Sequence, residues 1–170
     1  MAFKTIVASG KNSSFPHHTT KNKKLQRGFC IIDYGVRYKG YCSDTTRTVY
    51  LGKPSKKEVE IYNKVLQVQK DAIFMLEPGK TCGEIDASVR KVLGDRFTHG
   101  LGHGVGIEIH EMPSFQPDSK HVLENNMVFT IEPGVYYESI YGIRIEDTVL
   151  LKGKAVCLTK APKGLLRIGR

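Results

Sequence analysis

The chain has 170 residues, of which 40% are hydrophobic and 25% are charged, and its formal net charge is +9. This length and composition predict a single globular domain with a sizeable core, and they exclude an intrinsically disordered chain. No apolar run approaches the roughly 20 residues that a transmembrane helix needs, so we expect no membrane partner.

The basic residues are dispersed over expected loops and chain ends, with no aromatic platform between them. We interpret this charge as a solvated surface and expect no nucleic acid partner. The first ten residues lack the apolar segment of a signal peptide. The cysteines form no CxxC pair, which argues against a disulfide framework and favours a reducing, cytoplasmic location; they are Cys30, Cys42, Cys82 and Cys157.

The first third of the chain is expected to be rich in strands. Residues 2–9 read as a strand, and a polar loop closed by Pro16 follows. Residues 29–34 and 38–50 are rich in Tyr, Ile and Thr, so they predict two strands of one hairpin that turns at residues 35–37.

Two helices are expected in the middle of the chain. Ser55 is a suitable N-cap for a helix that runs to Leu76, and Glu77-Pro78-Gly79 ends it. Thr81 and Glu84 form a capping-box pattern that opens a second helix to about Leu93.

Strands return in the last third of the chain. We expect them at residues 104–109, 127–132, 142–151 and 155–158. Two strand-rich parts separated by two helices are typical of the α+β class.

Five segments place an acidic side chain or an imidazole inside or beside an expected strand. Each residue alone has a structural explanation, such as a turn cap, a solvated carboxylate or a histidine in a crowded loop. Isolated charges at apolar strand positions, however, cost several kcal/mol to bury, so the set together indicates a bound cation. Its members are Asp33, Asp44, His103, Glu132 and Glu146.

Four carboxylates and one imidazole would offset the charge of two divalent ions. Such an oxygen-rich set suits Mn²⁺ or Co²⁺ better than structural zinc. Two ions about 3.5 to 4 Å apart can hold a bridging hydroxide that attacks a carbonyl carbon. The stretch from His99 to His110 is dense in histidine and glycine but contains no HExxH motif, which excludes a helix-borne zinc peptidase site.

The motifs IIDYG, GYCSDTTRT, HGLGHGVGIEIHE, FTIEPGVY and GIRIEDT occur in this order. In this order and over nearly the whole chain, the sequence resembles the pita-bread metallopeptidases, the superfamily of methionine aminopeptidases, aminopeptidase P and prolidase. SDTTRT and GIRIEDT are similar to its proline-specific branch. The resemblance implies a pita-bread fold, in which helices back a curved antiparallel sheet. It also implies one catalytic domain, residues 1–170, without the N-terminal domain and first helices that usually accompany it.

The resemblance implies a role for each matching residue. Asp33 would bind one metal ion, His103 and Glu132 the other, and Asp44 and Glu146 would bridge them, with Glu132 also acting as general base. Arg144 would hold the carboxylates by charge-assisted hydrogen bonds. His17, His99 and His110 would orient the substrate and stabilise the oxyanion.

The implied reaction is hydrolysis of Xaa-Pro peptide bonds by a metal-bridging hydroxide, with two divalent ions. Mn²⁺ is our first choice of metal, with Co²⁺ and Zn²⁺ as alternatives. The implied partners are proline-containing peptides and a second copy of the chain in a homodimer. The first hypothesis is an Xaa-Pro dipeptidase. The second is aminopeptidase P, which acts on longer peptides. A non-catalytic peptide- or protein-binding module and a remnant that folds poorly alone are the further alternatives.

Overall fold

The computed structural model describes residues 1–169, and it has strands in both terminal parts of the chain and two α-helices between them. This order confirms the mixed helix and strand class. Within the described residues, neither helix is both long and apolar enough to cross a membrane. The strands are β1 (Ile6–Ser9), β2 (Gly28–Tyr34), β3 (Arg37–Tyr38), β4 (Tyr41–Cys42), β5 (Thr45–Leu51), β6 (Gly102–Gly104), β7 (Glu111–Phe115), β8 (Val128–Ile131), β9 (Gly134–Tyr137), β10 (Tyr141–Arg144), β11 (Asp147–Lys152), β12 (Lys154–Cys157) and β13 (Arg167–Ile168).

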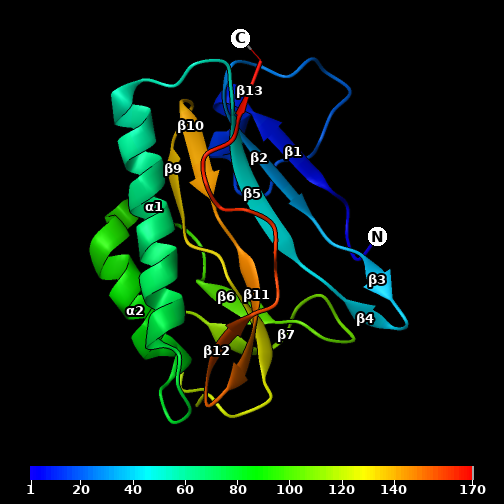
Figure 1. Ribbon diagram of the computed structural model, residues 1–170, viewed down its shortest axis with the longest axis vertical. Coiled ribbons are helices and arrows are strands. Elements are labelled where there is room, and N and C mark those ends of the chain that lie inside the picture. The colour runs from blue at the N-terminus through cyan, green and yellow to red at the C-terminus, as the bar shows by residue number, and fades with distance from the viewer. Residues whose placement is uncertain (170) are drawn as a thin grey trace.

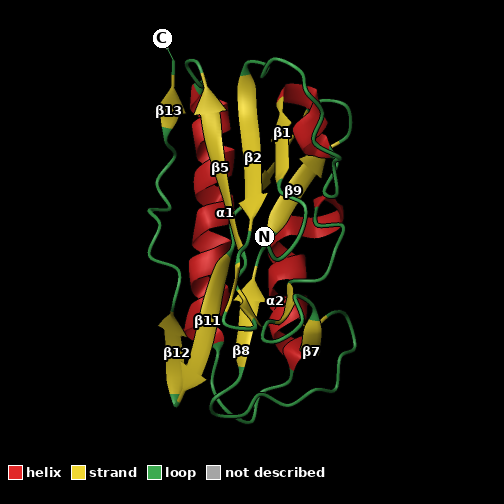
Figure 2. Cartoon of the chain, turned by 90° about the vertical axis from the view of Figure 1, so that its right-hand side faces the viewer, coloured by secondary structure: helices red, strands yellow, loops and turns green. Residues whose placement is uncertain are grey.

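Two sheets carry most of the strands. One has four strands in the order β1-β2-β5-β13, and the other has five in the order β12-β11-β8-β6-β7. The pairs β3-β4 and β9-β10 form two smaller ladders. All pairings are antiparallel except that of β13 with β5, which is parallel. Figure 1 shows the sheets curving around one side of the helices, and Figure 2 shows the strands in front of them.

The pairing of β2 with β5 corrects the expected hairpin. Asp33 lies opposite Thr46 and Tyr34 opposite Thr45, so the strands are joined by a ten-residue excursion, residues 35–44, rather than by a turn at 35–37. The short strands β3 and β4 form the tip of this excursion. At its base a Cβ on Gly35 would lie 2.0 Å from the carbonyl oxygen of Ser43, so only glycine fits there. The excursion returns the chain beside its starting point.

Both helices begin at the predicted residues. Helix α1 (Lys56–Met75) is capped by Ser55, and α2 (Cys82–Leu93) is capped by Thr81. Each forms a complete capping box, in which the side chain of the cap and that of the glutamate three residues on each bind the other's backbone N–H. Gly94, with φ of 63°, ends α2 in a conformation that favours glycine.

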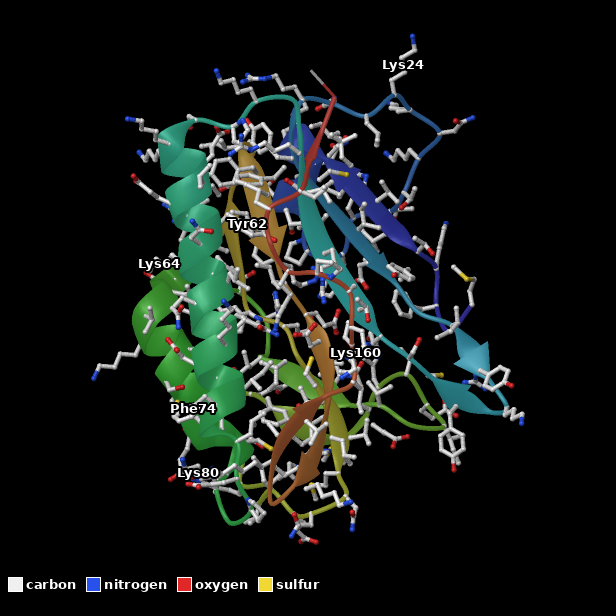
Figure 3. The ribbon with its side chains drawn as sticks, viewed as in Figure 1. Lys24, Tyr62, Lys64, Phe74, Lys80 and Lys160 are labelled. Carbon is white, nitrogen blue, oxygen red and sulfur yellow. The ribbon has the colours of Figure 1, made fainter. Side chains whose placement is uncertain are left out.

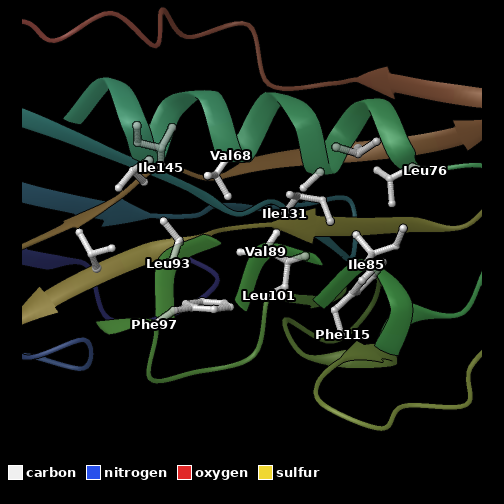
Figure 4. Close-up of a cluster of buried hydrophobic side chains, with 14 of the residues drawn as sticks. Val68, Leu76, Ile85, Val89, Leu93, Phe97, Leu101, Phe115, Ile131 and Ile145 are labelled. Carbon is white, nitrogen blue, oxygen red and sulfur yellow. The ribbon is translucent and has the colours of Figure 1, made fainter. Parts of the chain in front are cut away.

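The core lies between the helices and the sheets (Figure 4). Tyr62 of α1 is 1% exposed and points toward the strands, whereas Phe74 of the same helix is 91% exposed and points away from them (Figure 3). From the second sheet, Phe115 and Phe129 enter the core with their ring centroids 4.9 Å apart. Packing on this one face leaves the other face of the five-stranded sheet available for a site.

The later strands depart from the sequence-based expectation in two places. The strand expected at residues 104–109 is β6, which ends at Gly104, and β7 follows a loop. The strand expected at residues 142–151 is split at Ile145 and Glu146 into β10 and β11. Neither β9 nor β13 was among the expected strands.

Candidate metal centre

A cavity of about 680 Å³ is lined by strands of both sheets. It brings together residues that are up to 143 positions apart in the chain, from Phe3 to Glu146. All nine candidate site residues of the sequence analysis line it; they are His17, Asp33, Asp44, His99, His103, His110, Glu132, Arg144 and Glu146. Their chemical roles remain predictions.

The carboxylates lie on strands or at strand ends. Asp33 is on β2, Asp44 directly precedes β5, Glu132 directly follows β8, and Glu146 stands at the break between β10 and β11. Strand ends can turn a polar side chain into a cavity without removing a residue from the middle of a ladder. β2 pairs with β5 in one sheet and β8 with β11 in the other, and the backbone N–H of Glu146 donates to the carbonyl oxygen of Thr46 between the sheets, so these ends lie close together.

His103 faces these carboxylates. One oxygen each from Asp44 and Glu146 and one ring nitrogen of His103 all lie within 4.8 Å of one another. Nε2 of His103 is 3.6 Å from Oδ2 of Asp44 and 3.4 Å from Oε1 of Glu132. These distances allow the side chains to share a cation.

The imidazole of His103 is held in a form that can bind metal. Its Nδ1 lies 3.1 Å from the carbonyl oxygen of Gly104, which only accepts, so Nδ1 donates and the lone pair of Nε2 faces the carboxylates. Burial lowers the pKa of His103 to about 4, which keeps the ring neutral. A Cβ on Gly102 would lie 1.9 Å from the carbonyl oxygen of Thr130, so this glycine lets β6 approach β8 closely.

Arg144 supplies the permanent positive charge beside the carboxylates. Its Nη2 donates to Oδ2 of Asp33 at 2.7 Å, and its Nε lies 3.9 Å from Oε2 of Glu132. Its Nη1 donates at 3.0 Å both to the hydroxyl of Tyr136 and to the carbonyl oxygen of Pro16. The guanidinium is therefore fixed by partners on several elements.

A single arginine does not compensate four carboxylates. Burial, then repulsion from Glu146 and Asp33, raises the pKa of Asp44 to about 9. Burial and the charge of Asp33 raise the pKa of Glu146 to about 7, and burial and Glu146 raise the pKa of Glu132 well above its usual value. In addition, Oδ1 of Asp33 is buried without a hydrogen-bond partner. These features fit divalent cations, because a cation would satisfy the free oxygen and remove the repulsion.

His99 does not point its free nitrogen at the carboxylates. Its Nδ1 donates to the carbonyl oxygen of Gly100, so its Nε2 accepts from the hydroxyl of Tyr136 at 2.8 Å. That hydroxyl also accepts from Arg144, which makes a chain of hydrogen bonds from Arg144 through Tyr136 to His99. Burial and the charge of Arg144 lower the pKa of His99 to about 3, so its ring is neutral. This geometry connects His99 to the arginine rather than to the carboxylates.

The other two histidines lie at the mouth of the cavity. His110 is exposed, and its ring meets that of His103 edge-on with centroids 4.4 Å apart. His17 is also exposed and follows Pro16, whose carbonyl oxygen accepts from Arg144. Both imidazoles can reach a molecule entering the cavity.

Three supporting residues were not predicted. Thr46 Oγ1 donates to Oε2 of Glu146 at 2.7 Å, and Thr130 Oγ1 lies 3.4 Å from Oε1 of Glu132. Both threonines are two residues from a candidate ligand, so the alternation of a strand could have pointed to them. Tyr136 had no comparable signal, because no strand was expected at the position of β9.

Comparison with known proteins gives a consistent picture. Residues 1–153 match the model of metallopeptidase family M24. The Xaa-Pro dipeptidase of Pyrococcus furiosus is 46% identical over 172 aligned residues, which cover 97% of this chain and 49% of that protein. The prolidase of Pyrococcus horikoshii superposes with a TM-score of 0.93 at 44% identity, covering 97% of this chain and 50% of that one. The X-Pro aminopeptidase of Thermotoga maritima superposes with a TM-score of 0.94 at 39% identity, covering 98% and 49%. The chain thus spans about half the length of the curated relatives it matches.

Proposed function

Because the chain belongs to metallopeptidase family M24 and has the pita-bread fold of its structural neighbours, we propose that it hydrolyses Xaa-Pro peptide bonds with two divalent cations bound. The observation that carries the proposal is that all five candidate ligands line one cavity, and that three of them lie close enough together to share a cation. We propose residues 1–170 as one catalytic domain.

The candidate ligands divide between the two proposed cations. Asp33 would bind one cation, His103 and Glu132 the other, and Asp44 and Glu146 both. Asp44 and Glu146 lie close to each other and to His103, which supports the proposal that these two carboxylates bind both cations. Mn²⁺ remains the first choice, and Co²⁺ and Zn²⁺ the alternatives, because oxygen ligands predominate.

When bound, the cations would supply an activated water molecule for attack on the scissile carbonyl. Glu132, whose pKa is raised by burial and by Glu146, is suited to accept the proton of that water. Arg144 would keep the carboxylates in place, and Tyr136 and His99 would keep Arg144 in place. His17 and His110 would contact the substrate from the mouth of the cavity.

An Xaa-Pro dipeptide is the proposed substrate, supported by the names of the relatives from two Pyrococcus species. A longer peptide with proline in second position is the alternative, supported by the name of the Thermotoga maritima neighbour. Proline removes the N–H that many peptidases recognise, so a dedicated pocket is needed.

The proposed cytoplasmic location agrees with the four unpaired cysteines. The proposed homodimer is to be tested by light scattering.

The test is Mn²⁺-dependent hydrolysis of Ala-Pro beside Ala-Pro-Ala by the folded protein. Cleavage that a chelator abolishes and Mn²⁺ restores is the expected result, and the faster substrate distinguishes the dipeptidase from the aminopeptidase. Glu132→Gln is expected to bind peptide without cleaving it. A folded, Mn²⁺-loaded protein that cleaves neither peptide would contradict the proposal and favour a non-catalytic binding module.

A further inference from the structure

An ion pair on α2 lies outside the metal cavity but bonds a segment that lines it. Asp86 and Arg90 are one helical turn apart, and Nε and Nη2 of Arg90 lie 2.9 and 3.0 Å from the two carboxylate oxygens of Asp86. Asp86 is fully buried, and neither residue lines the cavity. Two parallel hydrogen bonds of this kind fix the orientation of the guanidinium as well as its position.

The pair holds the backbone around His99. Nη1 of Arg90 donates to the carbonyl oxygen of Phe97 at 2.8 Å, and Nη2 donates to that of His99 itself at 2.9 Å. Oδ1 of Asp86 accepts at 3.1 Å from the backbone N–H of Leu101, which also donates to a carbonyl oxygen of β7. The segment that carries His99 is therefore tied to α2 at three points.

Aromatic contacts connect the same pair to the ring of His99. The guanidinium carbon of Arg90 lies 4.6 Å from the ring centroid of Phe97, and that ring meets His99 edge-on with centroids 5.0 Å apart. Phe97 is buried in the core below α2 (Figure 4). His99 accepts from the hydroxyl of Tyr136, which accepts from Arg144. These contacts form an unbroken path from Arg90 to the arginine of the metal cavity.

The segment also bonds the candidate general base. The backbone N–H of Glu132 donates to the carbonyl oxygen of Leu101 at 2.8 Å, and Asp86 accepts from the N–H of the same Leu101. Catalytic groups must be held within about 0.5 Å of their productive positions. A shift of this segment would move both His99 and Glu132.

We propose that Asp86 and Arg90 are positioning residues, which act through residues 97–101 to fix the imidazole of His99 and the backbone of Glu132 in the metal cavity. This inference rests on the proposed function and adds to it two residues outside the cavity. The guanidinium makes four hydrogen bonds at once, two to a carboxylate and two to carbonyl oxygens. The ammonium group of a lysine is a point charge on a flexible chain and cannot replace all four.

Arg90→Met and Arg90→Lys test the inference through kcat and KM for the faster of Ala-Pro and Ala-Pro-Ala, with Mn²⁺ bound. We expect both variants to lower kcat by about 10- to 100-fold and to change KM less, because a small misplacement of catalytic groups has an effect of this size. Arg90→Lys is expected to keep a higher Tm than Arg90→Met, because it retains a positive charge beside Asp86.

Lys80→Met is the matched control. Lys80 also pairs with an acidic side chain, Glu77, and donates to a backbone carbonyl, that of Met75. These residues precede α2 and do not line the metal cavity. The control is expected to lower Tm and to keep the kcat of the wild type.

The tautomer of His99 gives a readout that does not depend on activity. Nδ1 of His99 donates to Gly100 and Nε2 accepts from Tyr136, so the metal-free protein is expected to show one fixed tautomer in ¹⁵N NMR of labelled histidine. The spectrum of His99→Gln identifies the signals. We expect both Arg90 variants to show an average of the two tautomers and Lys80→Met to show the fixed one. A residue that only stabilised the fold would not change this signature in molecules that remain folded.

Three results would overturn the inference. They are a fixed His99 tautomer in folded Arg90→Lys, a kcat of this variant equal to that of the wild type, and an equal loss of kcat in Lys80→Met. Failure of the proposed function is recognised separately, as a folded, Mn²⁺-loaded wild type that cleaves neither peptide. The NMR signature then decides alone: its loss in Arg90→Lys would support the positioning role, and its retention would overturn it.

Discussion

Arg144 and Asp33 form a buried ion pair across the two parts of the fold, with Nη2 of Arg144 2.7 Å from Oδ2 of Asp33. Arg144 ends β10 and Asp33 lies on β2, so the pair joins elements that are 111 residues apart. This guanidinium is the main positive charge that compensates the negative charge of the surrounding carboxylates.

Arg144→Met is therefore expected to destabilise the metal-free protein by about 3 kcal/mol, because it leaves buried carboxylates without a partner. The loss is expected to shrink with Mn²⁺, which would supply positive charge in place of the guanidinium. Urea unfolding with chelator and with Mn²⁺ measures both values. Arg37→Met is the control, because Arg37 makes only exposed contacts, a pair with Glu108 at 3.9 Å and a hydrogen bond to the carbonyl oxygen of Ile107, and its loss is expected to cost about 0.5 kcal/mol or less. Equal losses with and without Mn²⁺ would contradict the compensating role.

Thr46→Val is expected to weaken Mn²⁺ binding by about 10- to 100-fold, as removal of hydrogen bonds that orient ligands typically does. The reason is that Thr46 donates to the carboxylate of Glu146. Isothermal titration calorimetry measures the affinity. Thr20→Val is the control, because Thr20 bonds only the backbones of Thr5 and Val7 outside the site. It is expected to lower stability without changing Mn²⁺ affinity, and an equal loss of affinity in both variants would refute the orienting role.

Metal binding is expected to release protons and to tighten as pH rises from about 6 to 9. Burial and neighbouring carboxylates raise the pKa of Asp44 from 3.8 to about 9 and that of Glu146 from 4.5 to about 7. These groups therefore hold protons in the metal-free protein, and a cation must displace them. Titrations in buffers of different ionisation enthalpy count the protons released. Binding that is independent of pH would contradict the prediction.

The raised pKa of Asp44 also makes the stability of the metal-free protein depend on pH. A raised pKa in the folded state stabilises the fold below about pH 3.8, and this contribution is lost as pH rises through about 9. Asp44→Asn is expected to flatten this fall in Tm and to abolish the rise in Tm that Mn²⁺ causes in the wild type. Thermal scans from pH 5 to 9 test both effects. A variant that loses as much Tm over this range as the wild type would show that Asp44 is not the group responsible.

Lys163 anchors the C-terminal segment to the centre of the fold. It donates to Asp147 and Gln69, and Arg47 also donates to Asp147. Burial alone would raise the pKa of Asp147, but hydrogen bonds from Lys163, Gln69 and Arg47 hold it below its usual value. The ion pair is thus present above the unfolded pKa of Asp147 and is lost as pH falls through the lowered folded value.

Lys163→Met is expected to cost about 2 kcal/mol, the loss of a hydrogen bond to a buried charge. It is also expected to move acid unfolding to higher pH and to expose the C-terminal segment to proteases. Lys160→Met is the matched control, because Lys160 bonds only the exposed carbonyl of Cys157. Identical proteolysis of the two variants would argue against an anchoring role for Lys163.

The candidate ligands were visible in the sequence because their chemistry conflicts with their surroundings. Asp33 follows two isoleucines and Glu146 follows another, and such charges need a compensating partner. Tyr136 carries no such conflict, since a tyrosine in a strand is ordinary. Its contact with His99 and Arg144 could be recognised only after β9 and β10 were paired.

Local features of the sequence determined both helix starts, because Ser55 with Glu58 and Thr81 with Glu84 act within one turn of backbone. Motif order likewise indicated the family and the residues of its site. Only the tertiary structure decided how β2 pairs with β5 across the excursion at residues 35–44 and how one arginine meets several carboxylates. The meeting of the arginine with the carboxylates depends on contacts between residues about a hundred positions apart, such as Arg144 and Asp33 or Thr46 and Glu146. Such contacts form only when the whole core packs, and no local stretch of sequence encodes them.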